Sequence, residues 1–289
     1  MKKQDEIMRQ VRPVINIVIS ALMFALAGTL VKVASQKTDL LSLVFWRNVF
    51  SFLCVIITGA LSEKLDFSSE KKKMHVLRAF FTFLALISYF YSVAHTHLGN
   101  AVLLQQTSPI FVPLISLIVL KKMSDRYVWY GIIIGFIGVG LTTGIGFSTL
   151  NKGDLAGIVA GLMGGAATVT IWLMSSTEAP FKQMLYFSLY SLIFSISFIP
   201  WVWQSFDLTQ MPYFIALGIV TTLAQYFLSV ACSQAPTDKI ISWSYTSVIF
   251  ATLFGYLGWQ ENLSLSMLAG MLFIVLGATM STRVSVTRE

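Results

Sequence analysis

The chain has 289 residues, of which 56% are hydrophobic and only 11% are charged, and its mean hydropathy is +0.75. A soluble globular domain is usually about 25% charged, so the composition excludes an ordinary soluble protein. Long apolar runs of roughly 20 residues are typical of membrane-spanning helices. We therefore predict an all-α integral membrane protein.

Ten apolar segments follow one another along the chain, and short polar connections join them. The first is longer than the core of a signal peptide and lacks a clear small-residue cleavage site, so we predict that it is a spanning helix. Cys54 and Cys232 lie in apolar runs and form no CxxC motif, so they indicate no disulfide framework. The ten segments cover residues 13–34, 40–61, 74–94, 98–120, 127–147, 154–175, 182–203, 211–233, 238–259 and 264–282.

The basic residues are distributed unevenly between the two sides of these segments. When the connections are assigned to alternate sides, 16 of the 20 Lys and Arg residues fall on the side of the N-terminus, and only Lys37 and Lys152 fall on the other. Lys and Arg are retained on the cytoplasmic side of membranes. We therefore predict a multi-pass protein of the cytoplasmic (inner) membrane with both termini in the cytoplasm. The net charge of +7 then reflects topology, and no nucleic-acid partner is predicted.

The sequence contains an internal repeat. TSPIFVPL, from Thr107, aligns without a gap on TSVIFATL, from Thr246, and YFYSVA, from Tyr89, aligns on YFLSVA, from Tyr226. The chain therefore divides into two five-helix halves, residues 1–150 and 151–289. Because five is odd, the second half enters from the opposite side, as in the inverted repeats of many secondary transporters. Two glycine pairs continue the first alignment: Gly131 with Gly270, and Gly138 with Gly277.

Two long stretches carry a family resemblance. They are YFYSVAHTHLGNAVLLQQTSPIFVPLISLIVL, followed by GIIIGFIGVGL, and the counterpart that begins YFLSVACSQAPTDKIISWSYTSVIF. They resemble the EamA-type transporters of the drug/metabolite transporter superfamily. The resemblance implies ten transmembrane helices in two inverted five-helix repeats around a central cavity, with the third and fourth helices of each half shaping the gates.

The sequence departs from the family pattern at one site, and two of its motifs resemble one branch of the family more specifically. The family commonly has an acidic residue after the fourth helix of each half; Glu261 fits this pattern, whereas Lys121 and Lys122 do not. FWRNVF and HVLRAFF look similar to the bacterial S-adenosylmethionine uptake branch.

Polar residues in the fourth segment predict the wall of a substrate pathway. Gln105 and Gln106 precede Pro109 and Pro113 in LLQQTSPIFVPL. An unpaired polar group in hydrocarbon costs several kcal/mol, and each proline frees the carbonyl four residues back. Such breaks are tolerated where they line a cavity or contact other helices. The alternative for the glutamines is hydrogen bonding between helices alone.

Aromatic and amide side chains of other segments are further candidates for this pathway. Trp243 and Tyr245 occupy the positions that the repeat relates to Leu104 and Gln106. Aromatic walls with a few amides suit a partly apolar metabolite or a cation held over ring faces. The alternative for the tryptophans is packing or anchoring at the membrane interface. The remaining candidates of this kind are Tyr89, Trp172 and Gln225.

Two basic residues, Lys32 and Arg47, lie inside apolar segments. Lys32 is a candidate substrate ligand, or it extends to the lipid headgroups. Arg47 lies deeper, where it meets a substrate carboxylate or phosphate, or pairs structurally with a polar group such as Asn48. The structural role is the one we favour for Arg47.

The remaining ionisable residues argue against other function classes. Every carboxylate lies in a tail, a connection or a helix end, as Asp154, Glu178, Asp238 and Glu261 do, and this favours exchange or facilitated movement over buried-acid proton coupling. His95 and His97 have no evident third ligand, so we predict no metal and no cofactor. No nucleophile with a base, no paired intramembrane acids and no phosphate-binding GxxxxGK[ST] loop occur, so we predict no catalytic residues and no ATP-driven pump.

We therefore expect a secondary, non-ATP-driven transporter that moves a small organic metabolite by alternating access. Amino acids, nucleoside-type compounds and amphipathic amines are compatible substrates. The alternatives are a passive channel, for which no filter motif is present, and an intramembrane enzyme. The expected partners are the small-molecule substrate and the lipid bilayer. Substrate identity, direction, coupling, and a monomeric or homodimeric state stay open at this point.

Overall fold

The computed structural model describes residues 2–34, 37–95, 104–121, 123–143, 151–202, 208–259 and 264–282. All regular elements within these residues are helices. The first half contains α1 (Lys2–Ala34), α2 (Leu40–Leu61), α3 (Lys72–His95), α5 (Ser108–Leu120) and α6 (Arg126–Thr143). The second half contains α7 (Lys152–Met174), α8 (Pro180–Ser195), η1 (Ile196–Phe198), α9 (Ile199–Val202), η3 (Leu208–Gln210), α10 (Met211–Gln234), α11 (Thr237–Ile240), η4 (Ile241–Tyr245), α12 (Thr246–Trp259) and α13 (Leu265–Thr282).

These helices coincide with the ten predicted segments, which confirms the predicted fold class. Local sequence signals set several boundaries. Asp39 caps α2 by accepting hydrogen bonds from the backbone amides of Leu41 and Ser42, and Asn151 and Asp154 form a capping box at the start of α7. Proline begins α8, where its missing amide hydrogen costs no helical hydrogen bond.

Two of the predicted segments are interrupted. The prediction of one helix over 98–120 differs from the structure because α5 begins only at Ser108, with Pro109 in its first turn; residues 98–103 lie outside the described residues. The ninth segment divides into α11, the 3₁₀ stretch η4 and α12. Both interruptions end at repeat-related positions, just after Thr107 and just before Thr246.

The outer surface of the bundle is apolar. In the part of the chain that the structure describes, five helical stretches are long and apolar enough to cross a membrane: Val11–Ala34, Leu41–Leu61, Lys152–Met174, Met211–Gln234 and Thr237–Gly258. Large aliphatic side chains such as Ile118, Leu257 and Leu272 are more than half exposed. In water this surface would be unfavourable, whereas helices with internally satisfied backbones suit a lipid environment.

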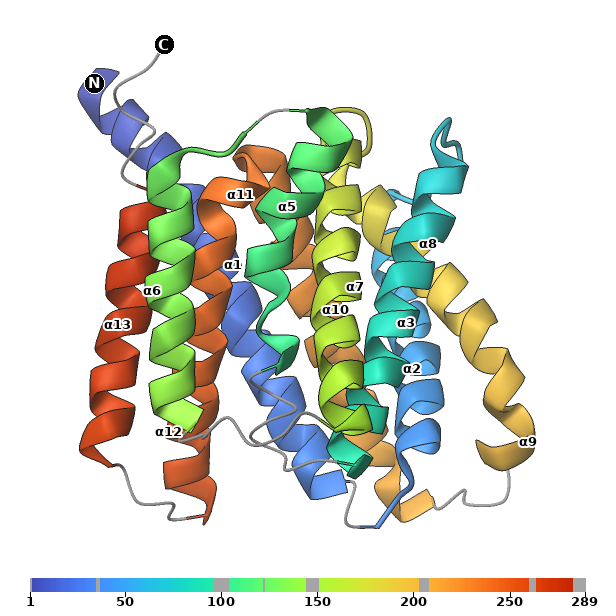
Figure 1. Cartoon of the computed structure of the whole chain (residues 1–289). Coiled ribbons are helices and arrows are strands. Elements are labelled where there is room, and N and C mark those ends of the chain that lie inside the picture. The colour runs from blue at the N-terminus through green and yellow to red at the C-terminus, as the bar shows by residue number, and fades with distance from the viewer. Residues whose placement is uncertain are drawn as a thin grey trace.

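The two halves are interlocked by an approximate two-fold relation. α3 packs extensively on α7, and α10 packs in the same way on α1. α5 packs on α7, and its counterpart α12 packs on α1. Each half thus supplies its first helix to the other half, and α6 and α13 pair with each other along one side of the bundle (Figure 1).

Glycines at the α6–α13 contact show this relation at residue level. A Cβ atom at Gly131 would lie 2.4 Å from the carbonyl oxygen of Gly277, and a Cβ atom at Gly138 would lie 2.6 Å from that of Gly270. The repeat alignment matches Gly131 with Gly270 and Gly138 with Gly277, so each glycine packs against the counterpart of the other. A two-fold contact has this reciprocal form, and the predicted inverted repeat is confirmed.

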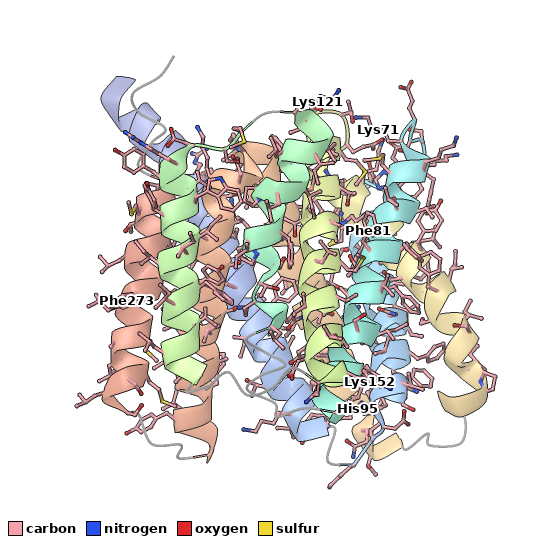
Figure 2. All side chains as sticks on the ribbon, viewed as in Figure 1. Lys71, Phe81, His95, Lys121, Lys152 and Phe273 are labelled. Carbon is pink, nitrogen blue, oxygen red and sulfur yellow. The ribbon has the colours of Figure 1, made fainter. Side chains whose placement is uncertain are left out.

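The end of the bundle that carries the chain termini is the one to which the sequence assigns 16 of the 20 Lys and Arg residues. The start of α1 and the end of α13 lie at the same end (Figure 1). Lys71 and Lys121 lie at this end, whereas Lys152 and His95 lie at the other (Figure 2). We call the end with Lys71 and Lys121 the basic end, and the other the opposite end. His97, Lys122 and Glu261, which entered the sequence argument, lie outside the described residues.

Candidate functional site

The two interrupted helices meet within the bundle. The Nε2 atom of Gln106 donates a hydrogen bond to the Oγ atom of Ser247, at 2.8 Å. Gln106 lies two residues before the start of α5, and Ser247 lies in the first turn of α12. The hydrogen bond between helices that the sequence left as an alternative for Gln106 is therefore present, and it joins the two breaks.

A glycine allows the break before α5 to lie against α7. A Cβ atom at Gly161 would be 2.1 Å from Thr107 Oγ1 and 2.8 Å from the carbonyl oxygen of Leu104. The Thr107 hydroxyl donates to that same carbonyl, at 2.6 Å. The carbonyl of Gln105 lies 3.3 Å from the same Cβ position. α7 thus covers the backbone of the break, and any residue larger than glycine at position 161 would displace that backbone.

The aromatic candidates of the ninth segment have different surroundings. Trp243 is partly buried and packs against an apolar cluster, and its indole Nε1–H has no hydrogen-bond partner among the described residues. Tyr245 is fully buried among Val139, Val248 and Ile274, with its ring against Gly135. In this conformation Tyr245 is therefore enclosed by α6 and α13, and the structure does not bring it to Gln106.

The other sequence candidates are spread through the bundle. Tyr89 on α3, Trp172 on α7 and Lys32 in the last turn of α1 are each partly buried. Arg47 on α2 donates from Nη2 to Asn48 Oδ1 at 2.8 Å, and Asn48 Nδ2 donates to the carbonyl of Ser191 at 3.2 Å. The structure thus shows the pairing with Asn48 that the sequence analysis favoured, and it connects α2 to α8.

Arg78 is the buried cation that the sequence analysis missed. The sequence placed Arg78 among the basic residues of the cytoplasmic side, yet its side chain is 0% exposed. It lies six positions after Lys72, where α3 begins, which corresponds to about 9 Å along the helix axis. A charged residue at the centre of a membrane helix costs about 2.5–3.5 kcal/mol on insertion scales. The signal in the sequence was HVLRAFF, in which apolar residues flank the arginine on both sides.

Arg78 connects three helices. Its Nη2 atom donates to Gln225 Oε1 at 3.1 Å and to Ser229 Oγ at 3.3 Å, both on α10. Its Nη1 atom donates to Gln183 Oε1 on α8 at 3.4 Å. The guanidinium also lies over the ring of Phe187, 5.0 Å from its centroid. The structure therefore places the predicted candidate Gln225 beside a cation instead of beside Gln106.

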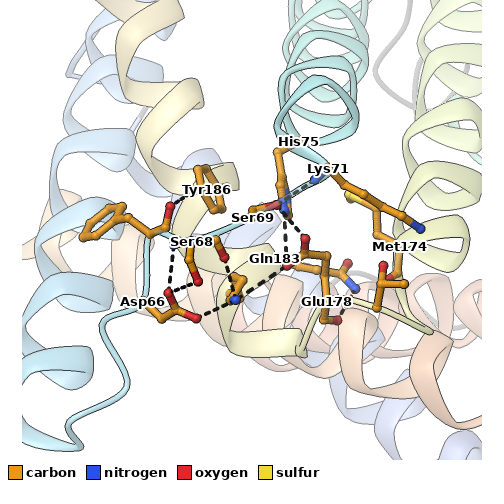
Figure 3. Close-up of polar contacts among 12 residues, drawn as sticks. Asp66, Ser68, Ser69, Lys71, His75, Met174, Glu178, Gln183 and Tyr186 are labelled. Atoms are coloured by element: carbon orange, nitrogen blue, oxygen red, sulfur yellow. Dashed lines mark hydrogen bonds and ion pairs between the residues drawn. The ribbon is translucent and has the colours of Figure 1, made fainter.

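A network of polar side chains at the basic end ties the connection between α2 and α3 to the start of α8 (Figure 3). Lys182 Nζ lies 2.5 Å from Asp66 Oδ2 and 4.0 Å from Glu178 Oε2. Glu178 also accepts a hydrogen bond from Ser69, at 2.5 Å, and lies 3.8 Å from the buried ring of His75. We call this set the basic-end network; its members are Asp66, Ser69, His75, Glu178 and Lys182.

The shortest charge pair of this network joins Asp66, in the connection between α2 and α3, to Lys182 in the first turn of α8. Hydrogen bonds from Lys182, and then from Ser68, hold the pKa of Asp66 well below its usual range. The Asp66 side chain is 49% exposed, so solvent screening limits what the pair adds to stability. The pair therefore fixes the position of the connection more than it stabilises the fold.

An apolar cluster lies below the basic end. It contains Val112 of α5, Val128 of α6, Val169 of α7, Cys232 of α10 and Ile240 of α11, and α1 contributes to it as well. Val128, Val169 and Cys232 lie on the half of their helices that is nearer the basic end. Ser124 and Asp238, joined by a hydrogen bond of 2.7 Å, cover the same region. Side chains from both halves thus pack together near the basic end.

Comparisons with known proteins agree with this architecture. A solved structure superposes with a TM-score of 0.80 over 96% of this chain and 99% of the other, at 15% identity, which shows the fold alone. The chain is 25% identical to a pseudopaline exporter of Pseudomonas aeruginosa, over 92% of this chain and 94% of that protein. It is 19% identical to an S-adenosylmethionine uptake transporter of Rickettsia bellii, over 80% of this chain and 79% of that protein.

The family comparison covers almost the whole chain and repeats the division into two halves. The model of the EamA-like transporter family matches twice, at residues 11–144 and again at residues 151–283. The family and the named relatives are transporters of small molecules and not enzymes. With its ten helical segments, its inverted repeat and these two matches, the chain belongs to the EamA-like transporter family, and it is a multi-pass membrane transporter.

Proposed function

We propose that this protein carries a small organic metabolite across the cytoplasmic membrane by alternating access, without ATP. The basic end faces the cytoplasm in this proposal, because Lys and Arg are retained on that side. The two inverted halves rock about the contact between their interrupted helices, and the substrate path opens first to one side and then to the other.

The observation that carries this proposal is the meeting of two repeat-related helix breaks at Gln106 and Ser247. Discontinuous helices at corresponding positions of two halves mark the substrate region in many secondary transporters. A 3₁₀ stretch within a helix, such as η4, often marks a hinge. Both features place a point of bending in the middle of the bundle, as alternating access requires.

The closed basic end supports the same mechanism. The basic-end network and the apolar cluster around Val112 and Ile240 block access from the cytoplasmic side. The conformation described here then corresponds to one that is closed toward the cytoplasm. Opening requires these contacts to separate, and the apolar cluster, which contains residues of both halves, is the part that a rocking motion would divide.

The proposed pathway contains Gln105 and Gln106 at the first break and Trp243 at the second. Gln225, next to Arg78, lies between this region and the basic end. Tyr89 and Trp172 remain proposed members from the neighbouring helices. We assign Tyr245 to packing and Arg47 to pairing with Asn48, because the structure shows those contacts.

Counterflow in proteoliposomes tests the proposal. Vesicles containing the purified protein are loaded with an unlabelled amino acid, nucleoside or quaternary amine, and uptake of the same labelled compound is measured against empty vesicles. A carrier gives a transient, saturable accumulation above the equilibrium level. The result that contradicts alternating access is flux that rises linearly with concentration and shows no counterflow, which is the behaviour of a channel.

A pair of variants connects that measurement to the break. Gln106→Ala removes the hydrogen bond to Ser247, and we expect it to lower the counterflow rate while the protein stays folded. Thr58→Ala is the matched control, because the Thr58 hydroxyl is exposed and donates only to carbonyls of its own helix. Equal rates for Gln106→Ala and Thr58→Ala would remove Gln106 from the proposed hinge.

A further inference from the structure

Arg78 is a buried cation surrounded by neutral partners. We propose that Arg78 binds an anionic group of the transported molecule, a carboxylate or a phosphate, and that the substrate is therefore an organic anion or a zwitterion. This inference rests on the proposed transport function and adds a substrate class to it. It comes from the contacts of Arg78 on α3, α8 and α10.

The hydrogen bonds of Arg78 are long and leave its Nε atom without a partner among the described residues. Its three acceptors, on Gln183, Gln225 and Ser229, lie at 3.1–3.4 Å, whereas N–H···O bonds in proteins are most often about 2.9–3.0 Å. The Nε–H group has no partner among the described residues, although the side chain is fully buried. A buried donor without an acceptor is costly, so the site is incomplete as it stands.

The nearest described acids are engaged elsewhere. Asp66 and Glu178 both approach Lys182, and Glu178 also accepts from Ser69. No ion pair to Arg78 is present among the described residues. An arginine side chain stays charged even when buried, so Arg78 is a cation that the protein itself does not neutralise.

The repeat shows that the fold does not need this cation. At the offset that aligns TSPIFVPL on TSVIFATL, Arg78 corresponds to Leu217 of α10, and both side chains are buried. One half of the molecule thus has an apolar side chain where the other has an arginine. The arginine is present in only one of the two repeat-related helices, and this difference points to a function other than packing.

The geometry suits one kind of ligand. A guanidinium presents a planar fork of N–H donors that matches carboxylate and phosphate oxygens. Phe187 covers one face of the Arg78 plane, so the edge with the free Nε–H is what remains for a ligand. Gln225 and Gln183 supply amide groups that can turn to accompany the anion. In the proposed mechanism the site on α3, α8 and α10 lies between the helix breaks and the basic end, on the route that the substrate takes.

Matched compounds test the inference. The probes are L-methionine with L-methioninamide, succinate with dimethyl succinate, and adenosine 5′-monophosphate with adenosine; each pair differs in its anionic group. Thermal stabilisation and competition in counterflow are measured for the wild type, Arg78→Gln, Arg78→Lys and Arg126→Gln. Arg126 is the matched control, because it also lies over an aromatic ring, 5.1 Å from the centroid of Tyr127, but it is exposed.

We expect an anionic member of at least one pair to bind, and its neutral or amide counterpart to bind far more weakly. The pair that responds distinguishes a carboxylate from a phosphate. Arg78→Gln should lower the apparent affinity at least about tenfold, which is the scale of a lost charged hydrogen bond. Arg78→Lys, which keeps the charge, should fold and retain part of the binding, and Arg126→Gln should bind like the wild type.

Two results would overturn the inference. In the first, the wild type shows saturable counterflow of a neutral compound, and the Arg78→Gln variant keeps that counterflow. Arg78 would then be a structural residue, and the transporter proposal would stand. Absence of counterflow with every compound, in the wild type as in the variants, would overturn the proposed function and the anion site together.

Discussion

Arg47 and Arg78 both lie within apolar helices of the described chain, and they differ in what surrounds them. Arg47 meets the carboxamide oxygen of Asn48, and Asn48 is itself held by a backbone carbonyl of α8. Arg78 meets three neutral groups at long distances, and its Nε atom has no partner among the described residues. Arg47 could be identified from the sequence because it lies deep in an apolar segment. Arg78 follows several lysines, so it looked like part of a basic connection.

Tyr245 gives a prediction at the residue scale. Its hydroxyl is buried and has no hydrogen-bond partner among the described residues, and its ring packs against Gly135. Tyr245→Phe removes a polar atom from apolar surroundings, so we expect an unchanged or higher thermal unfolding midpoint and unchanged counterflow. Tyr245→Ala should lower the midpoint, because loss of a large core aromatic costs about 3–5 kcal/mol. A transport defect in Tyr245→Phe would instead assign the hydroxyl to the pathway.

Asp66 gives a prediction about pH. Its pKa is depressed in the folded protein by Lys182 and Ser68, so its contribution is present above the unfolded pKa of about 3.9 and is lost as the pH falls through the lower, folded value. Between pH 5 and pH 8 the Asp66–Lys182 pair therefore stays ionised. We expect Asp66→Asn to leave the shape of a counterflow–pH profile unchanged over this range. An inflection that disappears in Asp66→Asn would contradict this assignment.

At the scale of elements, the α6–α13 pair depends on close backbone approach. A Cβ atom at Gly131 would lie 2.1 Å from Ser281 Oγ and 2.4 Å from the carbonyl of Gly277, whereas a Cβ atom at Gly140 of the same helix would meet nothing within 4 Å. We expect Gly131→Ala to destabilise the protein by about 1–3 kcal/mol, as overpacking does. Gly140→Ala should be neutral or slightly stabilising. Thermal unfolding in detergent measures both, and equal midpoints would contradict the two-fold contact.

The contact between the two interrupted helices is tested by a double-mutant cycle. Gln106→Ala, Ser247→Ala and the double variant each remove the hydrogen bond between them. Such bonds in membrane bundles couple by about 0.6 kcal/mol on average, so the double variant should lose less stability than the two single losses added together. Strictly additive losses would show that the pair does not interact in the membrane.

The sequence predicted much of the element scale, for physical reasons. The ten spans follow from the length of apolar runs, and the inverted repeat follows from matched residues such as Gly131 and Gly270. The direction in which a single side chain points was harder to predict. Both sides of a membrane helix are apolar, so the periodicity of the sequence carries little signal. Tyr245 is the example: the repeat places it opposite Gln106 in the alignment, but contact with Gly135 turns it toward α6 and α13.

At the scale of the whole molecule, the halves cannot be regarded as independent domains in space. The boundary near residue 150 divides the family matches, yet α1 packs on α10 and α7 packs on α3. This interlocking means that a rocking motion moves helices of both halves together. In the proposed motion, the contacts that separate are those of the basic end, while the glycine contact of α6 with α13 persists.

The accessibility of position 106 from each side of the membrane tests the central claim most directly. Gln106→Cys is placed in a background in which Cys54 and Cys232 are replaced by alanine, and an impermeant thiol reagent is applied to right-side-out and inside-out vesicles. We predict labelling mainly from the external side, and a shift toward cytoplasmic labelling when Lys182→Ala breaks the basic-end network. Fast labelling from both sides, unchanged by Lys182→Ala, would indicate a continuous pore and contradict alternating access.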